Sequence, residues 1–136
     1  MIFFETGLAT INYDEEIPYI FTEIRGFIKS EKLRYIAQKQ LELIELNHCT
    51  VLLNDFRKLK LMSRQDQEWI RKFWFPGAEQ MGVQQVAFVI PEFSFGELSL
   101  NRVCNNLKTN VQVALFHKPE QARFWLRTCQ SKYQCL

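Results

Sequence analysis

The chain has 136 residues, 47% of them hydrophobic, and its 17 basic and 15 acidic side chains leave a formal net charge of +2. This length and composition predict one domain with a buried core and exclude long disordered regions. The nearly balanced charge does not favour nucleic-acid binding. Without a long apolar stretch or a signal-peptide pattern, the sequence predicts a cytoplasmic protein that has no membrane span.

The first 25 residues predict a short strand followed by a β-hairpin. Residues 1–4 are all apolar and are followed by an acidic residue, which is typical of a short strand. Residues 8–13 alternate apolar and polar side chains, which is the period of a half-buried strand. Pro18 lies at the start of the next strand, residues 19–25, where its missing N–H does least harm. An acidic turn and no helix separate the two longer runs, so we expect them to pair antiparallel.

A long helix and a buried strand follow the hairpin. Ser30 is placed to cap a helix that runs to about Asn47 and carries an apolar stripe of Leu33, Ile36, Ala37, Leu41 and Ile44. Residues 51–53 form a continuous apolar run, which is typical of a strand covered on both faces. We expect Asn54 and Asp55 to close this strand, and we expect a loop to carry the basic residues Arg57, Lys58, Lys60 and Arg64.

A second helix is predicted from Ser63 to Pro76. Ser63 and Asp66 fit the capping box, in which each side chain satisfies a backbone donor of the first turn. Pro76 is expected to end the helix, because a proline cannot continue one without losing a hydrogen bond. The three- and four-residue spacing of bulky apolar residues places Trp69, Ile70, Phe73 and Trp74 on one side of this helix.

The last third of the chain alternates strands and helices. Residues 86–90 are a second continuous apolar strand, residues 94–107 a weaker helix and residues 111–116 the last strand. Pro119 lies in the first turn of a final helix, where proline is tolerated. Residues 131–136 are expected to form a frayed tail.

This order of elements predicts the architecture. Strands that alternate with helices require right-handed crossovers and a largely parallel sheet. We therefore expect one α/β domain over residues 1–136, with a mostly parallel mixed sheet and one antiparallel member from the hairpin. The apolar strands at 51–53 and 86–90 are expected to be neighbours in the buried middle of that sheet.

Any functional site is expected in residues 50–76, because ligands meet an open α/β sheet at the carboxyl ends of its strands. Asp55 and Arg57 are either a charged pair presented to a ligand or partner, or an ion pair that holds the local chain. Arg64 and the other basic residues either receive an anionic group or form a solvated loop. A capping role is enough to explain a serine at position 63, although the start of a helix also favours the binding of a phosphate group.

Trp74 and Phe75 are candidates for a docking face or a ligand pocket. Packing in the core accounts for Ile70 and for either Trp69 or Phe73. The other bulky residues of this helix are therefore not assigned to the core. An exposed apolar cluster usually marks an interface, and two-fold pairing is the commonest assembly of soluble proteins. We therefore expect a homodimer with Trp74 or Phe75 near the centre of its contact.

No catalytic, cofactor or metal signature is present in the sequence. The two histidines, His48 and His117, do not neighbour a candidate nucleophile, and there is no paired-carboxylate or Gly-rich phosphate motif. The four cysteines form no Cys-x-x-Cys pair, so we interpret them as small apolar residues and one tail thiol. We expect no enzymatic activity, no cofactor and no bound metal.

Several short segments carry a family resemblance, namely residues 54–57 (Asn-Asp-Phe-Arg), Ser63, residues 66–69 (Asp-Gln-Glu-Trp), residues 74–76 (Trp-Phe-Pro) and residues 86–91. With the order of elements, they make nearly the whole chain resemble an uncharacterised bacterial family grouped with STAS domains, the fold of the anti-sigma-factor antagonists. The resemblance implies a STAS-like fold and regulation through a kinase partner. The antagonists are phosphorylated on a serine at the start of the second helix, which is the place of Ser63. The usual Asp-Ser-Ser/Thr-Gly signature is missing there, so we expect no kinase to use Ser63.

These observations predict a non-catalytic protein-interaction or regulatory module that binds a protein partner or a second copy of itself. The alternative is a carrier or sensor of a small apolar or amphipathic molecule, held between helices rich in Trp and Phe. That alternative rests on the similarity of this fold group to the lipid-carrying CRAL-TRIO domains.

Overall fold

A computed structural model of the chain describes residues 2–14, 19–60, 62–91, 101–104 and 107–134, and their side chains except those of residues 2, 3, 14 and 129–134. The predicted acidic turn and most of the predicted 94–107 helix therefore lie outside the described residues, and so do the side chains of Cys129 and Cys135. No helix within the described ranges is both long and apolar enough to cross a membrane.

Six strands form one mixed sheet in chain order, namely β1 (Ile2–Glu5), β2 (Ala9–Asp14), β3 (Tyr19–Gly26), β4 (Val51–Leu59), β5 (Gln85–Val89) and β6 (Gln112–Phe116). β2 pairs antiparallel with both of its neighbours, whereas β3, β4, β5 and β6 pair parallel. The structure thus confirms the predicted α/β class and the mixed sheet with one antiparallel member from the hairpin. The strand order never reverses among these six strands. They therefore have no switch point of the kind that forms a ligand crevice in doubly wound sheets.

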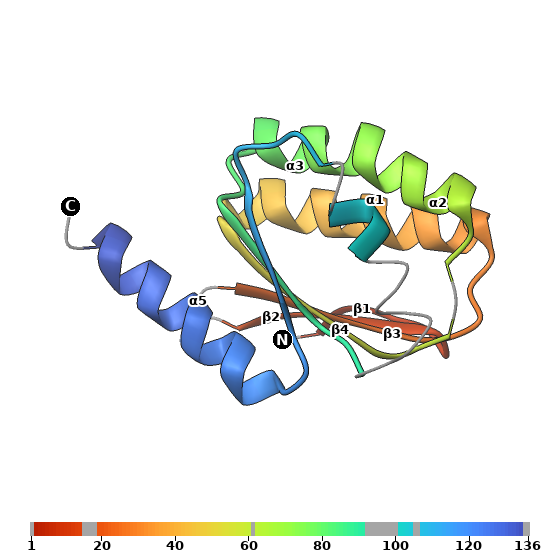
Figure 1. Cartoon of the computed structure of the whole chain (residues 1–136), viewed down its shortest axis with the longest axis horizontal. Coiled ribbons are helices and arrows are strands. Elements are labelled where there is room, and N and C mark those ends of the chain that lie inside the picture. Colours follow the sequence, from red (N-terminus) through yellow and green to blue (C-terminus); the bar gives the residue numbers. More distant parts are fainter. Residues whose placement is uncertain (1, 15–18, 61, 92–100, 105–106, 135–136) are drawn as a thin grey trace.

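Helices cover both faces of the sheet (Figure 1). One face carries α1 (Ser30–Asn47) and a second long helical segment made of α2 (Arg64–Trp69), η1 (Ile70–Trp74) and α3 (Phe75–Gln80). The other face carries α5 (Pro119–Gln134), whose last turn overlaps the tail expected from residue 131. Residues 101–104 form a further short helical turn beside α2 and η1.

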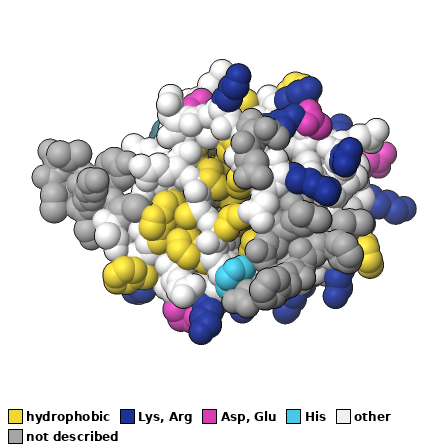
Figure 2. Space-filling model, in the orientation of Figure 1, with side chains coloured by type: hydrophobic (Ala, Val, Ile, Leu, Met, Phe, Trp, Pro, Cys, Tyr) yellow, Lys and Arg dark blue, Asp and Glu magenta, His cyan; other side chains and the backbone are white. Residues whose placement is uncertain are grey.

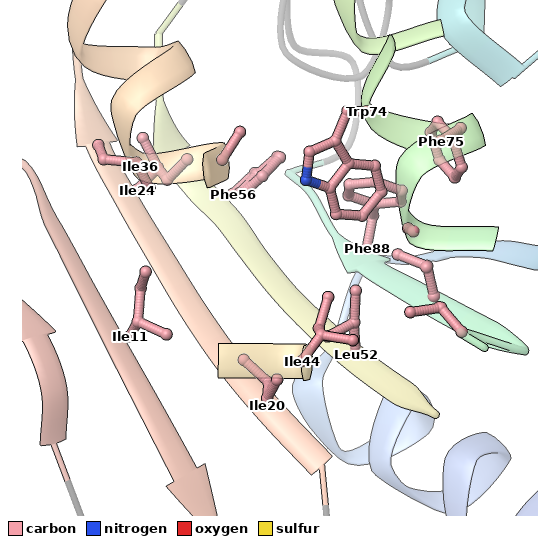
Figure 3. Packing of buried hydrophobic residues seen from close by; sticks show 14 of the residues in the cluster. Ile11, Ile20, Ile24, Ile36, Ile44, Leu52, Phe56, Trp74, Phe75 and Phe88 are labelled. Carbon is pink, nitrogen blue, oxygen red and sulfur yellow. The ribbon is translucent and has the colours of Figure 1, made fainter. Parts of the chain in front are cut away.

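The middle strands alternate their side chains between two cores. Leu52 and Val86 pack with α1 and α3 on one face, whereas Leu53 and Val89 pack with α5 on the other. All four are fully buried, and β4 pairs parallel with β5. The structure confirms that the two continuous apolar strands are neighbours in the middle of the sheet, where both faces are covered. Figure 3 shows part of the first core, between α1 and the helical segment that contains Trp74.

β4 is longer than the sequence predicts. Asn54 and Asp55 do not close it, because the strand continues to Leu59 and pairs with β3 as far as Gly26. Both polar side chains are buried, and both have partners: Asn54 Oδ1 accepts from Gln40 Nε2 at 3.0 Å, and Asp55 binds Arg57. A buried polar residue is tolerated in a strand when its hydrogen bonds are made. The predicted loop for Arg57 and Lys58 is therefore wrong, since both lie within the strand.

Two predicted helix boundaries are also wrong. Lys29 occupies the N-cap of α1 without a side-chain hydrogen bond, and Ser30 is the first helical residue. Ser30 Oγ instead donates to Asp66 Oδ2 at 3.0 Å, which ties α1 to α2. Pro76 does not end the second helical segment, because it lies in the first turn of α3, directly after η1. The segment continues through Pro76 at the junction of η1 and α3, at the cost of the one backbone N–H donor that proline lacks.

Candidate anion-binding site

η1 decides where the bulky residues of the second helical segment point. It is a π-helical turn, in which each N–H bonds to the carbonyl five residues back rather than four. The extra residue rotates the following positions, so Trp74 and Phe75 face the core at 3% and 0% exposure while Phe73 is 64% exposed. The predicted exposed cluster at Trp74 and Phe75 is therefore wrong, and so is the expectation that they form the centre of a homodimer contact. Replacing them by Ser and Lys should unfold the chain rather than separate subunits.

Asp55 and Arg57 satisfy each other. The Asp55 carboxylate accepts from Arg57 Nε at 2.9 Å and from Arg57 Nη2 at 2.7 Å, and it also accepts from the Arg57 backbone N–H. The pKa of Arg57 is raised, chiefly by this hydrogen bond. Both carboxylate oxygens are used, so this pair fits the predicted local ion pair better than a site presented to a ligand.

Ser63 caps α2 as predicted. Its Oγ accepts from the Asp66 backbone N–H at 3.1 Å. The other half of the predicted capping box is replaced, because the Asp66 carboxylate accepts from Ser30 Oγ and lies 4.0 Å from Arg34 Nε. Ser63 therefore has a structural task in the first turn of the helix.

Arg64 belongs to a pocket that the sequence only half predicts. A hollow of about 250 Å³ lies between the second helical segment and the turn at residues 101–104, and it is lined by Arg64, Gln67, Glu68, Arg71, Arg102 and Val103. We call these six residues the arginine pocket. Figure 2 shows Lys and Arg side chains gathered over this part of the surface. The predicted basic loop is divided instead, since Arg57 and Lys58 lie on β4 and Lys60 directly follows it.

The arginine pocket carries an excess of positive charge. The part of its lining that the structure describes has three guanidinium groups and one carboxylate. That carboxylate, Glu68, already pairs with Arg71 through one oxygen and with Lys72 Nζ at 3.3 Å through the other. The pKa of Glu68 is lowered, mainly by the hydrogen bond from Lys72. Within the described part of the chain, Arg64 and Arg102 pair with no carboxylate.

Sequence reasoning missed Arg71 and Arg102. Arg71 is seven positions after Arg64, the spacing of residues on one helix face, so a search for charge at helical spacing would have found it. Arg102 has no such signal, because only the fold brings residues 101–104 to the second helical segment.

The other chemistry-bearing side chains form no reactive site in the described residues. No group of three or more His, Cys, Asp or Glu side chains there is arranged to hold a metal ion. Cys49 is buried and Cys104 is partly buried, and burial raises the pKa of both thiols, to about 11 for Cys104. Few of these thiols are ionised at neutral pH, so they are poor nucleophiles and poor metal ligands.

Comparison of the chain with models of protein families finds no match, and a comparison with curated proteins finds no similar sequence.

Proposed function

We propose that this chain is a non-catalytic recognition domain whose arginine pocket binds an anionic group carried by a protein partner. The observation that carries the proposal is the convergence of Arg64, Arg71 and Arg102 on one hollow of about 250 Å³ whose described lining contains a single carboxylate. A guanidinium group presents its donors in a planar fork that matches carboxylate and phosphate oxygens. The pocket therefore suits an oxyanion, either a phosphate or a carboxylate.

The charge balance supports this use of the pocket. Glu68 is shared between Arg71 and Lys72, so it does not neutralise the other two arginines. Arg64 and Arg102 are both exposed, and neither makes an ion pair among the described residues, which leaves their donors available to a ligand. Two such cations at one hollow repel each other, and an anion between them would relieve that repulsion.

The pocket supports binding rather than catalysis. Glu68 is the single carboxylate among the lining residues that the structure describes. Two cations keep it ionised, which makes it a poor proton donor near neutral pH. Among the described lining residues there is no serine, cysteine, histidine or lysine that would act as a nucleophile.

The proposal includes a STAS-like regulatory role in the cytoplasm. What supports this assignment is the α/β sheet that begins with a hairpin and continues with alternating helices and strands. Binding of a protein partner is also what the resemblance implies for domains of this kind. Self-association remains a prediction, with a contact that lies away from the buried Trp74 and Phe75.

The apolar cavity beside Trp74 does not favour the alternative of an apolar-ligand carrier. The cavity beside Trp74 has a volume of about 30 Å³. An engineered cavity that binds benzene has about 150 Å³, so this cavity is too small for an apolar ligand of even that size.

Fluorescence anisotropy with labelled peptides tests the proposed function. Three peptides of one sequence carry phosphoserine, glutamate or serine at the central position. We expect the phosphoserine and glutamate peptides to bind and the serine peptide to bind at least tenfold more weakly. The expectation follows because a charge-assisted hydrogen bond contributes about 1.5–3 kcal/mol, and about 1.4 kcal/mol is a factor of ten in affinity.

Two double variants show whether the pocket is responsible. Arg64→Gln with Arg102→Gln removes two pocket charges without breaking an ion pair among the described residues. Arg123→Gln with Arg127→Gln removes the same charge from exposed positions on α5, on the other face of the sheet. We expect the first pair to abolish discrimination between the peptides and the second to leave it intact. Equal effects of the two pairs, or no binding of either anionic peptide by the wild type, would contradict the proposal.

A further inference from the structure

A small, partly open cavity lies where α1 and η1 meet the sheet. It has a volume of about 30 Å³ and is lined by Ile24, Leu33, Ala37, Gln40, Asn54, Phe56, Ile70, Trp74 and Phe88. All of these residues are buried except Ile70, which is partly exposed. The lining is mostly apolar, but it includes two amide side chains and the indole of Trp74.

The indole N–H of Trp74 has no hydrogen-bond partner in the described structure. The Trp74 side chain is buried, and its Nε1 is one of the few fully buried polar atoms that make no hydrogen bond. In Figure 3 the indole lies beside Phe88, and its nitrogen is on the side that faces Phe56. A buried donor without a partner costs roughly 1–3 kcal/mol, so a native fold rarely leaves one unsatisfied.

The amide side chains in the lining provide an acceptor. Gln40 Nε2 donates to Thr22 Oγ1 at 2.8 Å and to Asn54 Oδ1 at 3.0 Å. These bonds fix Asn54 Oδ1 as an acceptor, and an amide oxygen has two lone pairs, so it can accept a second bond. The residues that line the cavity therefore include a donor, Trp74 Nε1–H, and an acceptor, Asn54 Oδ1.

We infer that this cavity is a specific binding site for one water molecule, which accepts from Trp74 Nε1–H and donates to Asn54 Oδ1. A water needs at least about 10–15 Å³ of such space and two to four polar partners. The cavity meets both conditions, and its volume excludes an aromatic ligand. The bound water joins η1, through Trp74, to β4, through Asn54, and Gln40 extends the network to α1 and β3.

Magnetisation transfer from water to the indole hydrogen detects the site directly in solution by NMR. The chain has three tryptophans, so Trp69→Phe and Trp125→Phe variants identify the Trp74 signal. A long-lived bound water gives a cross-relaxation signal of opposite sign to that of surface water. We expect that signal for Trp74, and its absence would overturn the inference.

Filling the cavity distinguishes a water site from an ordinary packing gap. Ala37 lines the cavity, so Ala37→Val introduces two methyl groups into it. If the space is a simple gap, the added apolar contact stabilises the fold. If the space holds the water, the methyl groups expel it and leave the indole N–H unpaired. We therefore expect Ala37→Val to lower the urea midpoint of the wild type.

The same substitution in a Trp74→Phe background is the matched control. That background lacks the indole donor, so expelling the water leaves no unpaired N–H. The helix-propensity cost of valine is common to both backgrounds and cancels in the double-mutant cycle. We expect a smaller drop in the midpoint, or a rise, in the Trp74→Phe background. Equal drops in the two backgrounds, or a higher midpoint for Ala37→Val in the wild type, would overturn the inference.

Discussion

Two phenylalanines that are two residues apart provide a direct test of the π-helical turn. Phe75 is 0% exposed and its ring lies 4.9 Å from that of Trp74, whereas Phe73 is 64% exposed. Removing a buried phenylalanine side chain costs about 3–5 kcal/mol, while an exposed substitution usually changes stability by less than about 0.5 kcal/mol. We therefore expect Phe75→Ala to be destabilising and Phe73→Ala to be nearly neutral, although the two changes are chemically identical.

Urea unfolding followed by circular dichroism measures the difference. With a slope of about 2 kcal/mol per molar urea, Phe75→Ala should lower the midpoint by about 2 M and Phe73→Ala by about 0.2 M or less. Phe75→Leu and Phe73→Leu provide a milder pair if Phe75→Ala does not fold, with a loss expected in the first alone. A larger loss at residue 73 than at residue 75 would refute the argument, because an uninterrupted α-helix would direct Phe73 inward.

Further predictions concern the cap, the buried network, acid stability and self-association. Ser63→Ala should lower the free energy of unfolding, measured in urea, by about 1 kcal/mol, whereas Ser63→Asp should be nearly neutral. Stoichiometric phosphate on Ser63 in protein from the native cell would show that this serine has more than a structural role. Gln40→Leu removes both bonds of the buried amide and should cost about 1–3 kcal/mol, so unchanged thermal stability would contradict the network. The lowered pKa of Glu68 means that its carboxylate stabilises the fold above the ordinary value of 4.5, and that this contribution is lost as the pH falls through the lowered value. Glu68→Gln should therefore flatten the loss of stability on acidification, and an unchanged pH profile would show that the ion pairs contribute nothing. Sedimentation equilibrium at tens of micromolar tests the expected homodimer, and a monomer there would rule out a dimer of micromolar affinity.

The sheet could be predicted because its signals are local. Residues 51–53 and 86–90 are continuous apolar runs, and such runs indicate strands covered on both faces. The length of β4 could not be predicted in the same way. Asn54 and Asp55 are residue types that are typical of strand ends. They are tolerated inside the strand because Gln40 and Arg57 hydrogen-bond to their side chains. Gln40 is in α1, so its contact with Asn54 is visible only after the chain has folded.

The members of the arginine pocket were largely not predicted. Four of its six residues come from residues 50–76, but the sequence pointed to Arg64 alone, and the pocket is lined by helical residues rather than by the strand ends where a site was expected. The error at Trp74 and Phe75 has a different cause. An i, i+3, i+4 pattern assumes an unbroken α-helix. A π-helical turn adds one residue to a turn and so changes which later residues face the core, and the spacing of apolar residues before the turn does not reveal this change.

The sequential order of the strands has a consequence for how the chain folds. Each described strand after β1 hydrogen-bonds to the strand that precedes it in the chain. No described strand is therefore inserted between two strands that come earlier in the chain. Low sequence separation between contacting residues is associated with fast folding. We therefore expect the sheet to grow strand by strand from the hairpin and the β3–α1–β4 unit. Substitutions in this unit should slow refolding in stopped-flow experiments, while those in β6 should mainly accelerate unfolding.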